Sequence, residues 1–212
     1  MRNERFLPVA VVLWAILLVL AGCSPFGTGT RHQTDNYVLN SLFSEETPQQ
    51  PLADLSDIGV LVGPIRMAMY LDRSDVVIRN SRNEVEIADF ASWAGPLREN
   101  FSRVLAENLS LWLSTKKVAI FPSTRLRLFD YSVHMNVTRF DGRPGDKTHL
   151  RARWAITDRK RRTLYNDHTV LSLPTEDDSM ASMVASQSRL LADFSREIAV
   201  AIKDLEAKKG AQ

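Results

Sequence analysis

The sequence has a single cysteine, Cys23, among its 212 residues. No disulfide can form within one chain, and the paired cysteines of a CxxC metal site are missing. An excess of charge of one sign is missing too, because 27 Lys and Arg residues face 25 Asp and Glu residues and the formal net charge is +2. So small a net charge gives no support to nucleic-acid binding, and we expect no nucleic-acid partner.

Motifs of enzyme active sites are missing as well. The chain has no G-x-S-x-G nucleophile turn, no glycine-rich phosphate loop and no H-E-x-x-H zinc motif. Apart from His32, the histidines are His134, His149 and His168, on or beside successive predicted strands. They are the only candidates for a catalytic or metal site, but His134 is out of phase with the apolar residues of its strand, which indicates surface histidines. We therefore predict no enzyme activity, no cofactor and no metal.

What is present first is an apolar run from Phe6 to Ala21, preceded by Arg2 and Arg5. A basic start, an apolar stretch and small residues after it are the three parts of a secretory signal. An uncleaved transmembrane helix is the alternative, although the run is shorter than the roughly 20 apolar residues that span a bilayer. We predict a signal peptide over residues 1–22.

Cys23 directly follows this run in Leu20-Ala21-Gly22-Cys23, which resembles the bacterial lipobox. The thiolate is a good nucleophile near neutral pH, and the resemblance implies that Cys23 carries a diacylglyceryl group and, as the new N-terminus, an N-acyl chain. A lone core cysteine is the alternative, but the position after a signal-like run favours lipidation. Ser24 stands where an Asp would favour the inner membrane, so the resemblance implies the periplasmic leaflet of the outer membrane.

The segment after the lipidation site is polar and contains Pro, Gly and Thr, so we predict a flexible tether over residues 23–36. The remaining length, with 44% hydrophobic residues in the chain, suits one medium domain. We place this single domain at residues 37–207 and a disordered tail at 208–212. No internal repeat of the solenoid type is present.

Extended segments and one helix are predicted in the first half of the domain. The extended segments are 37–42, a stretch from Ile58 with a bend at Gly63-Pro64, and 117–122. Apolar residues recur every three or four positions from Trp93 to Leu113, which predicts a helix.

A hairpin is predicted between the bend and this helix. The runs DVVIRN and EVEIADF flank the turn-rich stretch NSRN. In the expected pairing, Val76 and Ile78 face Val85 and Ile87 across the two strands.

Apolar and polar residues alternate in the second half, over 131–138 and 150–157, and a third extended segment follows at 163–174. Three strands joined by polar turns form an antiparallel meander with one apolar and one polar, basic face. The order of elements predicts an α+β fold: a mixed, largely antiparallel sheet with two main helices packed on one face.

The second helix is expected from Asp178 to Ala207, with Thr175 or the neighbouring aspartates Asp177 and Asp178 at its N-terminus. Its apolar stripe includes Met180 and Met183. A lipid-adaptable groove is one interpretation of the two methionines, and core packing is the one we favour.

Basic residues gather in two turn-rich segments, RLRLFD at 125–130 and DRKRR at 158–162. Such residues can touch acidic lipid headgroups or an acidic partner. Solvated turns explain them equally well. The sequence leaves both interpretations open.

Two longer stretches resemble the PqiC/YmbA group of ABC-type transport auxiliary lipoproteins: VGPIRMAMYLDRSDVVIR and FASWAGPLRENFSRVLAENLSLWL. The group has a Val-Gly-Pro strand, a Tyr-Leu-Asp-Arg segment, a strand that ends in Arg, and a helix that starts with Trp-x-x-Pro-Leu. These elements fall here, in the same order, on Val62-Gly63-Pro64, Tyr70-Leu71-Asp72-Arg73, Arg79, and Trp93-Ala94-Gly95-Pro96-Leu97.

The resemblance implies a non-enzymatic accessory lipoprotein that works with an MCE-domain protein in lipid transport between two membranes and so supports outer-membrane integrity. A periplasmic lipid- or solute-binding carrier is the alternative, and it requires a deep apolar cavity of roughly 300 Å³ or more. We hypothesise that Tyr70, Asp72 and Arg73 contact the partner or a second copy in a homo-oligomer, since Tyr and Arg are frequent interface anchors. The competing interpretation is that Asp72 and Arg73 only close a turn.

Overall fold

The computed structural model describes residues 33–44, 50–124 and 128–211. The predicted signal peptide, Cys23 and most of the predicted tether lie outside these residues. From Thr34 onward, the described residues pack as one compact unit. Within the described ranges, none of the helices has both the length and the apolar character needed to cross a bilayer.

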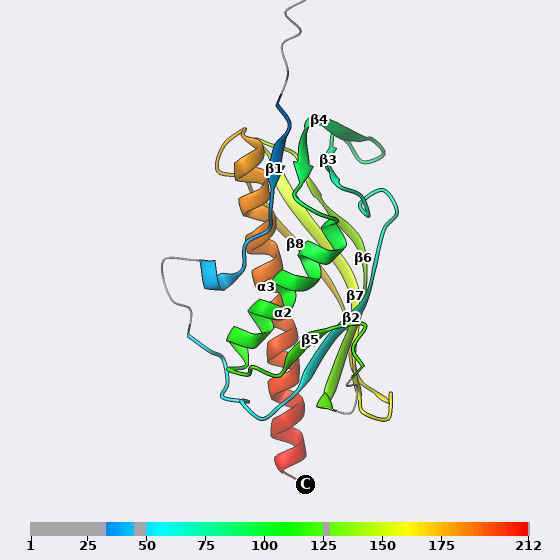
Figure 1. Ribbon diagram of the computed structural model, residues 1–212, viewed down its shortest axis with the longest axis vertical. Helices are drawn as coiled ribbons and strands as arrows, with labels where there is room; N and C mark the ends of the chain where they lie inside the picture. The colour runs from blue at the N-terminus through cyan, green and yellow to red at the C-terminus, as the bar shows by residue number, and fades with distance from the viewer. Residues whose placement is uncertain (1–32, 45–49, 125–127, 212) are drawn as a thin grey trace, which may run out of the picture. The chain divides into compact units, whose positions relative to one another are not determined.

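One mixed sheet and two long helices make up this unit (Figure 1). The strands are β1 (Asp35–Tyr37), β2 (Val60–Met67), β3 (Asp75–Arg79), β4 (Val85–Trp93), β5 (Val118–Ile120), β6 (Tyr131–Gly142), β7 (Lys147–Asp158) and β8 (Thr163–Pro174). The helices are α2 (Leu97–Trp112), α3 (Met180–Gly210) and the short 3-10 helix η1 (Leu42–Ser44).

Strand β6 is the centre of the sheet. It pairs with β7 in antiparallel fashion along its length, and β7 pairs in the same way with β8. On its other side β6 lies parallel to β2 and, at its far end, to β3. Parallel pairing also joins β1 to β4 and β2 to β5, whereas β3 and β4 form an antiparallel hairpin. The predicted α+β class with a mixed sheet and an antiparallel meander is confirmed.

Both helices cover one face of the sheet, as predicted (Figure 1). Phe101 of α2 packs edge-on against Phe140 of β6, with 5.2 Å between ring centroids. Phe194 of α3 packs in the same way against Trp154 of β7, at 6.1 Å. Met183 is fully buried in the core and Met180 packs against it, so the methionines of α3 belong to the core.

Strand β6 departs once from strict alternation. Its register with β7 shifts between Val137 and Arg139, which inserts one extra residue. Val137 and Phe140, three positions apart, are therefore both buried in the core. Because side chains alternate along a strand, Arg139 and Asp141 then share the face away from the helices. This bulge positions the first candidate site.

The β3–β4 hairpin is present, but the predicted pairing is wrong by one residue. Val77 lies opposite Ile87, and Arg79 lies opposite Val85. The turn takes in Glu84, whose carbonyl accepts the backbone N–H of Asn80 at 3.2 Å. A turn one residue longer than NSRN shifts the register by one position, which moves side chains to the other face.

The predicted strand at 37–42 is also wrong, because β1 spans only Asp35–Tyr37. Its first residues lie within the expected tether. Beyond β1 the chain crosses the helices: the N–H of Asn40 donates to Ser188 Oγ at 3.1 Å, and that of Leu42 to Asn108 Oδ1 at 2.8 Å. Side chains of α2 and α3 thus satisfy backbone groups that a strand neighbour would otherwise satisfy.

Both long helices begin later than predicted. Trp93 is the last residue of β4, and α2 begins after Pro96, because the residue before a proline is disfavoured in a helix. Helix α3 is capped by Ser179 rather than by Thr175 or the aspartates: Ser179 Oγ accepts the N–H of Ser182 at 3.0 Å. At its other end α3 continues to Gly210, three residues into the expected tail.

Candidate functional site

A buried carboxylate, Asp141, lies just after the bulge of β6 with its side chain 0% exposed. Arg79, at the end of β3, donates from Nε to Oδ1 at 3.0 Å and from Nη2 to Oδ2 at 2.9 Å. Arg139 donates from Nε to Oδ1 at 2.8 Å, and the hydroxyl of Tyr70 donates to Oδ2 at 2.7 Å. We call Tyr70, Arg79, Arg139 and Asp141 the Asp141 cluster.

The protonation states in the Asp141 cluster follow from these contacts. Burial opposes ionisation of Asp141, but hydrogen bonds from Arg79, Arg139 and Tyr70 outweigh it and hold the pKa of the carboxyl below its usual value. Burial and the bond to Asp141 raise the pKa of Tyr70 to about 12, so the phenol keeps its proton. Arg79 also stacks on the Tyr70 ring, 5.5 Å from its centroid.

The depressed pKa of Asp141 predicts a dependence of stability on pH. Since the folded-state pKa lies below the unfolded value of about 3.9, the charged carboxylate stabilises the fold above that pH. The contribution is lost as the pH falls through the folded pKa. We expect the difference in unfolding free energy between wild type and Asp141→Asn to be constant from pH 7 to about pH 5 and to shrink below about pH 4. Urea titrations of both proteins at each pH measure this difference in unfolding free energy. A difference independent of pH would contradict the lowered pKa of Asp141 in the folded protein.

The Asp141 cluster ties down the segment that connects β2 and β3. Beside Tyr70, the N–H of Ala68 donates to the carbonyl of Val137 at 2.9 Å, and Leu71 is buried in the core. Met69 lies between these attachments and is 93% exposed. The structure thus presents an apolar side chain on a segment that is held on both sides.

The three residues predicted as partner contacts have different surroundings. The Tyr70 hydroxyl is engaged inside the Asp141 cluster, so it fixes the segment rather than offering a free polar group. Asp72 is exposed, and its Oδ1 lies 3.5 Å from Nε of Arg98 at the start of α2. Arg73 donates from Nε to Oδ2 of Asp75 at 2.9 Å. Both ion pairs lie at the surface, where such pairs are weak and exchange readily with those of a partner.

The histidines lie along the meander on three strands. His134 is opposite Ala155, and His149 is opposite Asp141 on β6 and Ser172 on β8. Burial lowers the pKa of His134 and, together with Arg139, that of His149. Across residues 33–44, 50–124 and 128–211, no three His, Cys, Asp or Glu side chains are grouped so that they could hold a metal ion.

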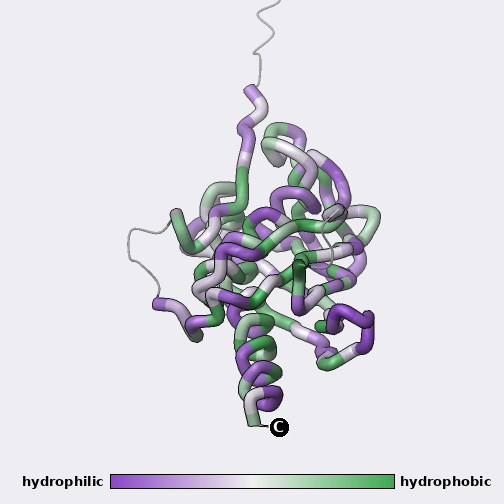
Figure 2. Tube along the Cα trace, turned by 60° about the horizontal axis from the view of Figure 1, so that its bottom comes forward, coloured by the Kyte–Doolittle hydropathy of each residue, from purple (hydrophilic) through white to green (hydrophobic). Residues whose placement is uncertain are grey.

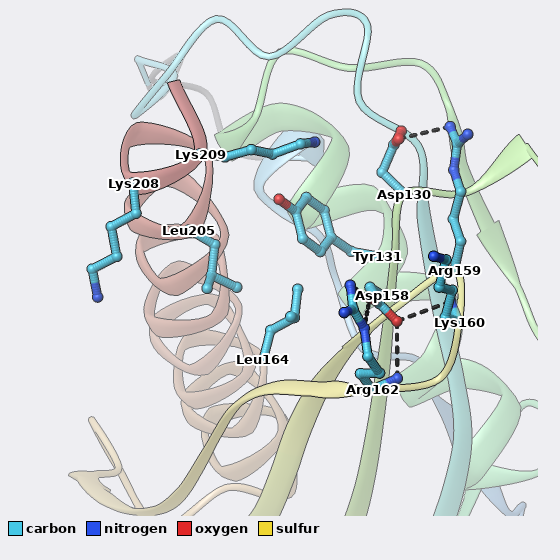
Figure 3. A pocket seen from close by; sticks show the side chains of 10 residues that line it. All are labelled: Asp130, Tyr131, Asp158, Arg159, Lys160, Arg162, Leu164, Leu205, Lys208 and Lys209. Carbon is cyan, nitrogen blue, oxygen red and sulfur yellow. Dashed lines mark hydrogen bonds and ion pairs between the residues drawn. The ribbon is translucent and has the colours of Figure 1, made fainter. Parts of the chain in front are cut away.

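A second candidate site is a surface pocket of about 490 Å³ where the last turns of α3 meet the turn between β7 and β8 (Figure 3). The end of α3 and the β7–β8 turn, which form it, lie at the opposite end of the domain from β1 (Figure 1). Around these last turns of α3, hydrophobic and hydrophilic residues alternate (Figure 2). We call it the basic pocket, and its lining residues are Asp130, Tyr131, Asp158, Arg159, Lys160, Arg162, Leu164, Leu205, Lys208 and Lys209.

Asp158 shapes the turn that forms one wall of the basic pocket. Its Oδ1 accepts the backbone N–H groups of Lys160 and Arg162, both at 2.9 Å. Its Oδ2 accepts from Nε of Arg162 at 2.7 Å, and these hydrogen bonds hold the pKa of Asp158 below its usual value. Across the mouth, Arg159 pairs with Asp130 at 2.7 Å. The DRKRR segment is thus a turn with fixed backbone, whose cations line a hollow.

Sequence reasoning overlooked the centre of the Asp141 cluster. Tyr70 and Arg79 are both residues on which the family resemblance rests, yet nothing in their spacing indicates that they meet on one carboxylate. Asp141 itself reads as part of the turn DGRPGD. The available signal was the break in alternation after Val137, which a strand with a bulge explains.

The comparisons with known proteins agree with this architecture. Residues 37–199 match the family described as ABC-type transport auxiliary lipoprotein component. No curated protein matches the chain. The crystal structure of an uncharacterized protein is similar with a TM-score of 0.64 and 21% identity, over 80% of this chain and 99% of that one. Protein XCC0632 from Xanthomonas campestris is similar with a TM-score of 0.62 and 15% identity, over 78% and 94%. At these identities the two structures show the fold alone.

Proposed function

The chain belongs to the family of ABC-type transport auxiliary lipoprotein components, and from this premise we propose that it is an accessory subunit of an MCE-type lipid transport system. In this role it is anchored by lipid to a membrane and works with an MCE-domain protein that carries lipids between the two membranes. The system supports outer-membrane integrity. The match over residues 37–199 is the observation that carries the proposal, because it includes most of the described domain.

The anchor in this proposal is Cys23, with a diacylglyceryl group on its sulfur and an acyl chain on its amine. Two or more acyl chains hold a protein on a bilayer stably, whereas one chain gives only marginal binding. We place the anchor in the periplasmic leaflet of the outer membrane, because Ser24 rather than Asp follows the cysteine. A domain on such an anchor has a high effective concentration near its membrane, which favours docking of a partner there.

The docking contact that we propose is the segment around Met69, with the charges of Asp72 and Arg73 beside it. Met69 is exposed and apolar, and the Asp141 cluster keeps its segment in one conformation. A held segment loses little conformational entropy when it binds. Tyr70 acts as the residue that positions the segment, and a homo-oligomer of this chain is the second partner that the same contact can serve.

The carrier alternative has less support. A carrier needs a deep apolar cavity, and the space between the sheet and the helices of the described unit is filled by buried side chains such as Phe101, Phe140 and Phe194. The basic pocket and a second hollow, lined in part by Phe121 and Phe129, both open at the surface. The family, moreover, is one of transport components and not of enzymes.

Capture of partners from the native envelope tests the proposal. The full lipidated chain is solubilised in mild detergent and purified by affinity, and retained proteins are identified by mass spectrometry. We expect an MCE-domain protein with the wild type, and about tenfold less of it when Met69, Asp72 and Arg73 are all replaced by alanine, since loss of an interface anchor costs 1 to 2 kcal/mol or more.

The matched control replaces Val170, Asp57 and Arg161 by alanine. These three residues are exposed and lie outside the proposed contact. Equal recovery of the partner with both triple variants would remove the docking segment from the proposal. Recovery of a stoichiometric lipid or solute without any protein partner would instead favour the carrier.

A further inference from the structure

The basic pocket has more positive charge than its own carboxylates neutralise. It is lined by Arg159, Lys160, Arg162, Lys208 and Lys209, against Asp130 and Asp158. Asp130 and Asp158 hold Arg159 and Arg162. Lys209 lies 3.2 Å from Glu206 on the same helix, and Glu206 also accepts from the hydroxyl of Tyr131.

Lys160 and Lys208 are the cations of the lining that these carboxylates do not pair with. Within the part of the chain that the structure describes, neither side-chain ammonium makes a hydrogen bond or ion pair, and both residues are exposed. Figure 3 shows them on opposite walls of the basic pocket, Lys160 in the β7–β8 turn and Lys208 on α3, where the Lys208 side chain extends along the outer side of the helix, away from the Tyr131 ring. A negatively charged ligand in the basic pocket would lie between the cations of the two walls.

The floor of the basic pocket is apolar. Leu164 from β8 and Leu205 from α3 lie next to each other beside the Tyr131 ring (Figure 3), and Leu164 is 39% exposed. Cations around exposed aliphatic carbon are complementary to a molecule that has an anionic group joined to an apolar one. A purely ionic ligand would leave these carbon atoms in water.

We propose that the basic pocket binds the phosphate group of an anionic phospholipid, with the first part of its acyl chains against Leu164 and Leu205. Lys and Arg side chains form strong, charge-assisted hydrogen bonds with phosphate oxygens. The volume of about 490 Å³ lies within the range of small-ligand sites and suits a headgroup with a short length of chain. The proposal rests on the proposed transport role in one respect: that role makes a lipid the source of the phosphate group.

Another explanation exists for the lysines of α3, because cations at a helix C-terminus interact favourably with the helix dipole. Lys160 lies in a turn, so this explanation does not cover it. Substitutions on both walls therefore separate a binding site from helix stabilisation. The Asp158 bonds to backbone N–H groups keep the turn in place when the Lys160 side chain is changed.

The test is a titration of the full lipidated protein in a nonionic detergent, followed by calorimetry. The probes are dihexanoylphosphatidylglycerol and inorganic phosphate. We expect the phospholipid to bind more tightly than inorganic phosphate, and Lys160→Glu with Lys208→Glu to raise the dissociation constants of both by about tenfold or more. The matched control, Lys116→Glu with Lys203→Glu, reverses two exposed charges outside the basic pocket and leaves both constants unchanged.

A second pair of variants separates the two sources of phosphate. Leu164→Asn weakens binding of the phospholipid but not of inorganic phosphate, whereas Val170→Asn, an exposed change on the same strand, weakens neither. Equal affinity for both probes would show a site for free phosphate and overturn the lipid assignment. Binding that no variant alters, or no binding, would overturn the site itself. Partner capture does not depend on this titration, so its result stands separately.

Discussion

Replacing Asp141 with alanine is expected to lower the free energy of unfolding by about 3 to 5 kcal/mol, because it leaves the buried charges of Arg79 and Arg139 without their partner. Both guanidinium groups are mostly covered, with side-chain exposures of 17% and 27%. The hydroxyl of Tyr70 loses its acceptor at the same time. A substitution that removes one member of a paired network costs more than the bonds it deletes, since the remaining members stay desolvated.

Urea unfolding followed by circular dichroism measures this loss in the solubilised protein. Asp57→Ala is the matched control, because it removes a carboxylate that also pairs with a cation, Lys117, but is 99% exposed. Surface pairs of this kind contribute little. If the midpoints of the two variants shifted alike, the Asp141 cluster would not be holding the segment around Met69.

The meander and the two helices could be predicted because each depends on local pattern. Apolar residues recur with a period of two over 131–137 and of three to four over 97–112. Such a period arises whenever a strand or helix buries one face, whatever that face packs against. The same rule sets the limit of such predictions. Where the chain pairs with a distant segment, as β1 does with β4 and β2 with β6, no local pattern specifies the neighbour or the direction.

The two candidate sites could be predicted only in part, for the same reason. Tyr70 and Arg79 stand out as members of a family pattern, but Asp141, 62 residues after Arg79, joins them only through the parallel pairing of β3 with β6 and the bulge beside it. The DRKRR turn is visible as charge, whereas its apolar floor and the lysines of α3 come from other parts of the chain. The sequence thus shows which side chains are present, whereas long-range pairing decides which of them meet in a site.

Cys23→Ala is expected to abolish labelling of the protein with radioactive palmitate and to remove it from the outer-membrane fraction. The thiol is the proposed attachment point of the diacylglyceryl group, and an alanine offers no nucleophile there. Each buried methylene of an acyl chain contributes about 0.8 kcal/mol, so two chains account for nearly all of the affinity for the bilayer. Sucrose-gradient fractionation and palmitate labelling of the two proteins measure the change.

The intact mass of the purified wild type distinguishes this anchor from an uncleaved membrane helix. Processing at the proposed site gives a chain that begins at Cys23 and carries the added lipid, whereas an uncleaved helix keeps Met1 and no lipid. Ser24→Ala is the matched control: it changes the next side chain and keeps both label and fraction. Ser24→Asp is expected to keep the label but move the protein to the inner-membrane fraction, which separates the chemistry of the anchor from its destination. A wild type that retained residues 1–22 without label would refute lipidation and leave the apolar run from Phe6 to Ala21 as the anchor.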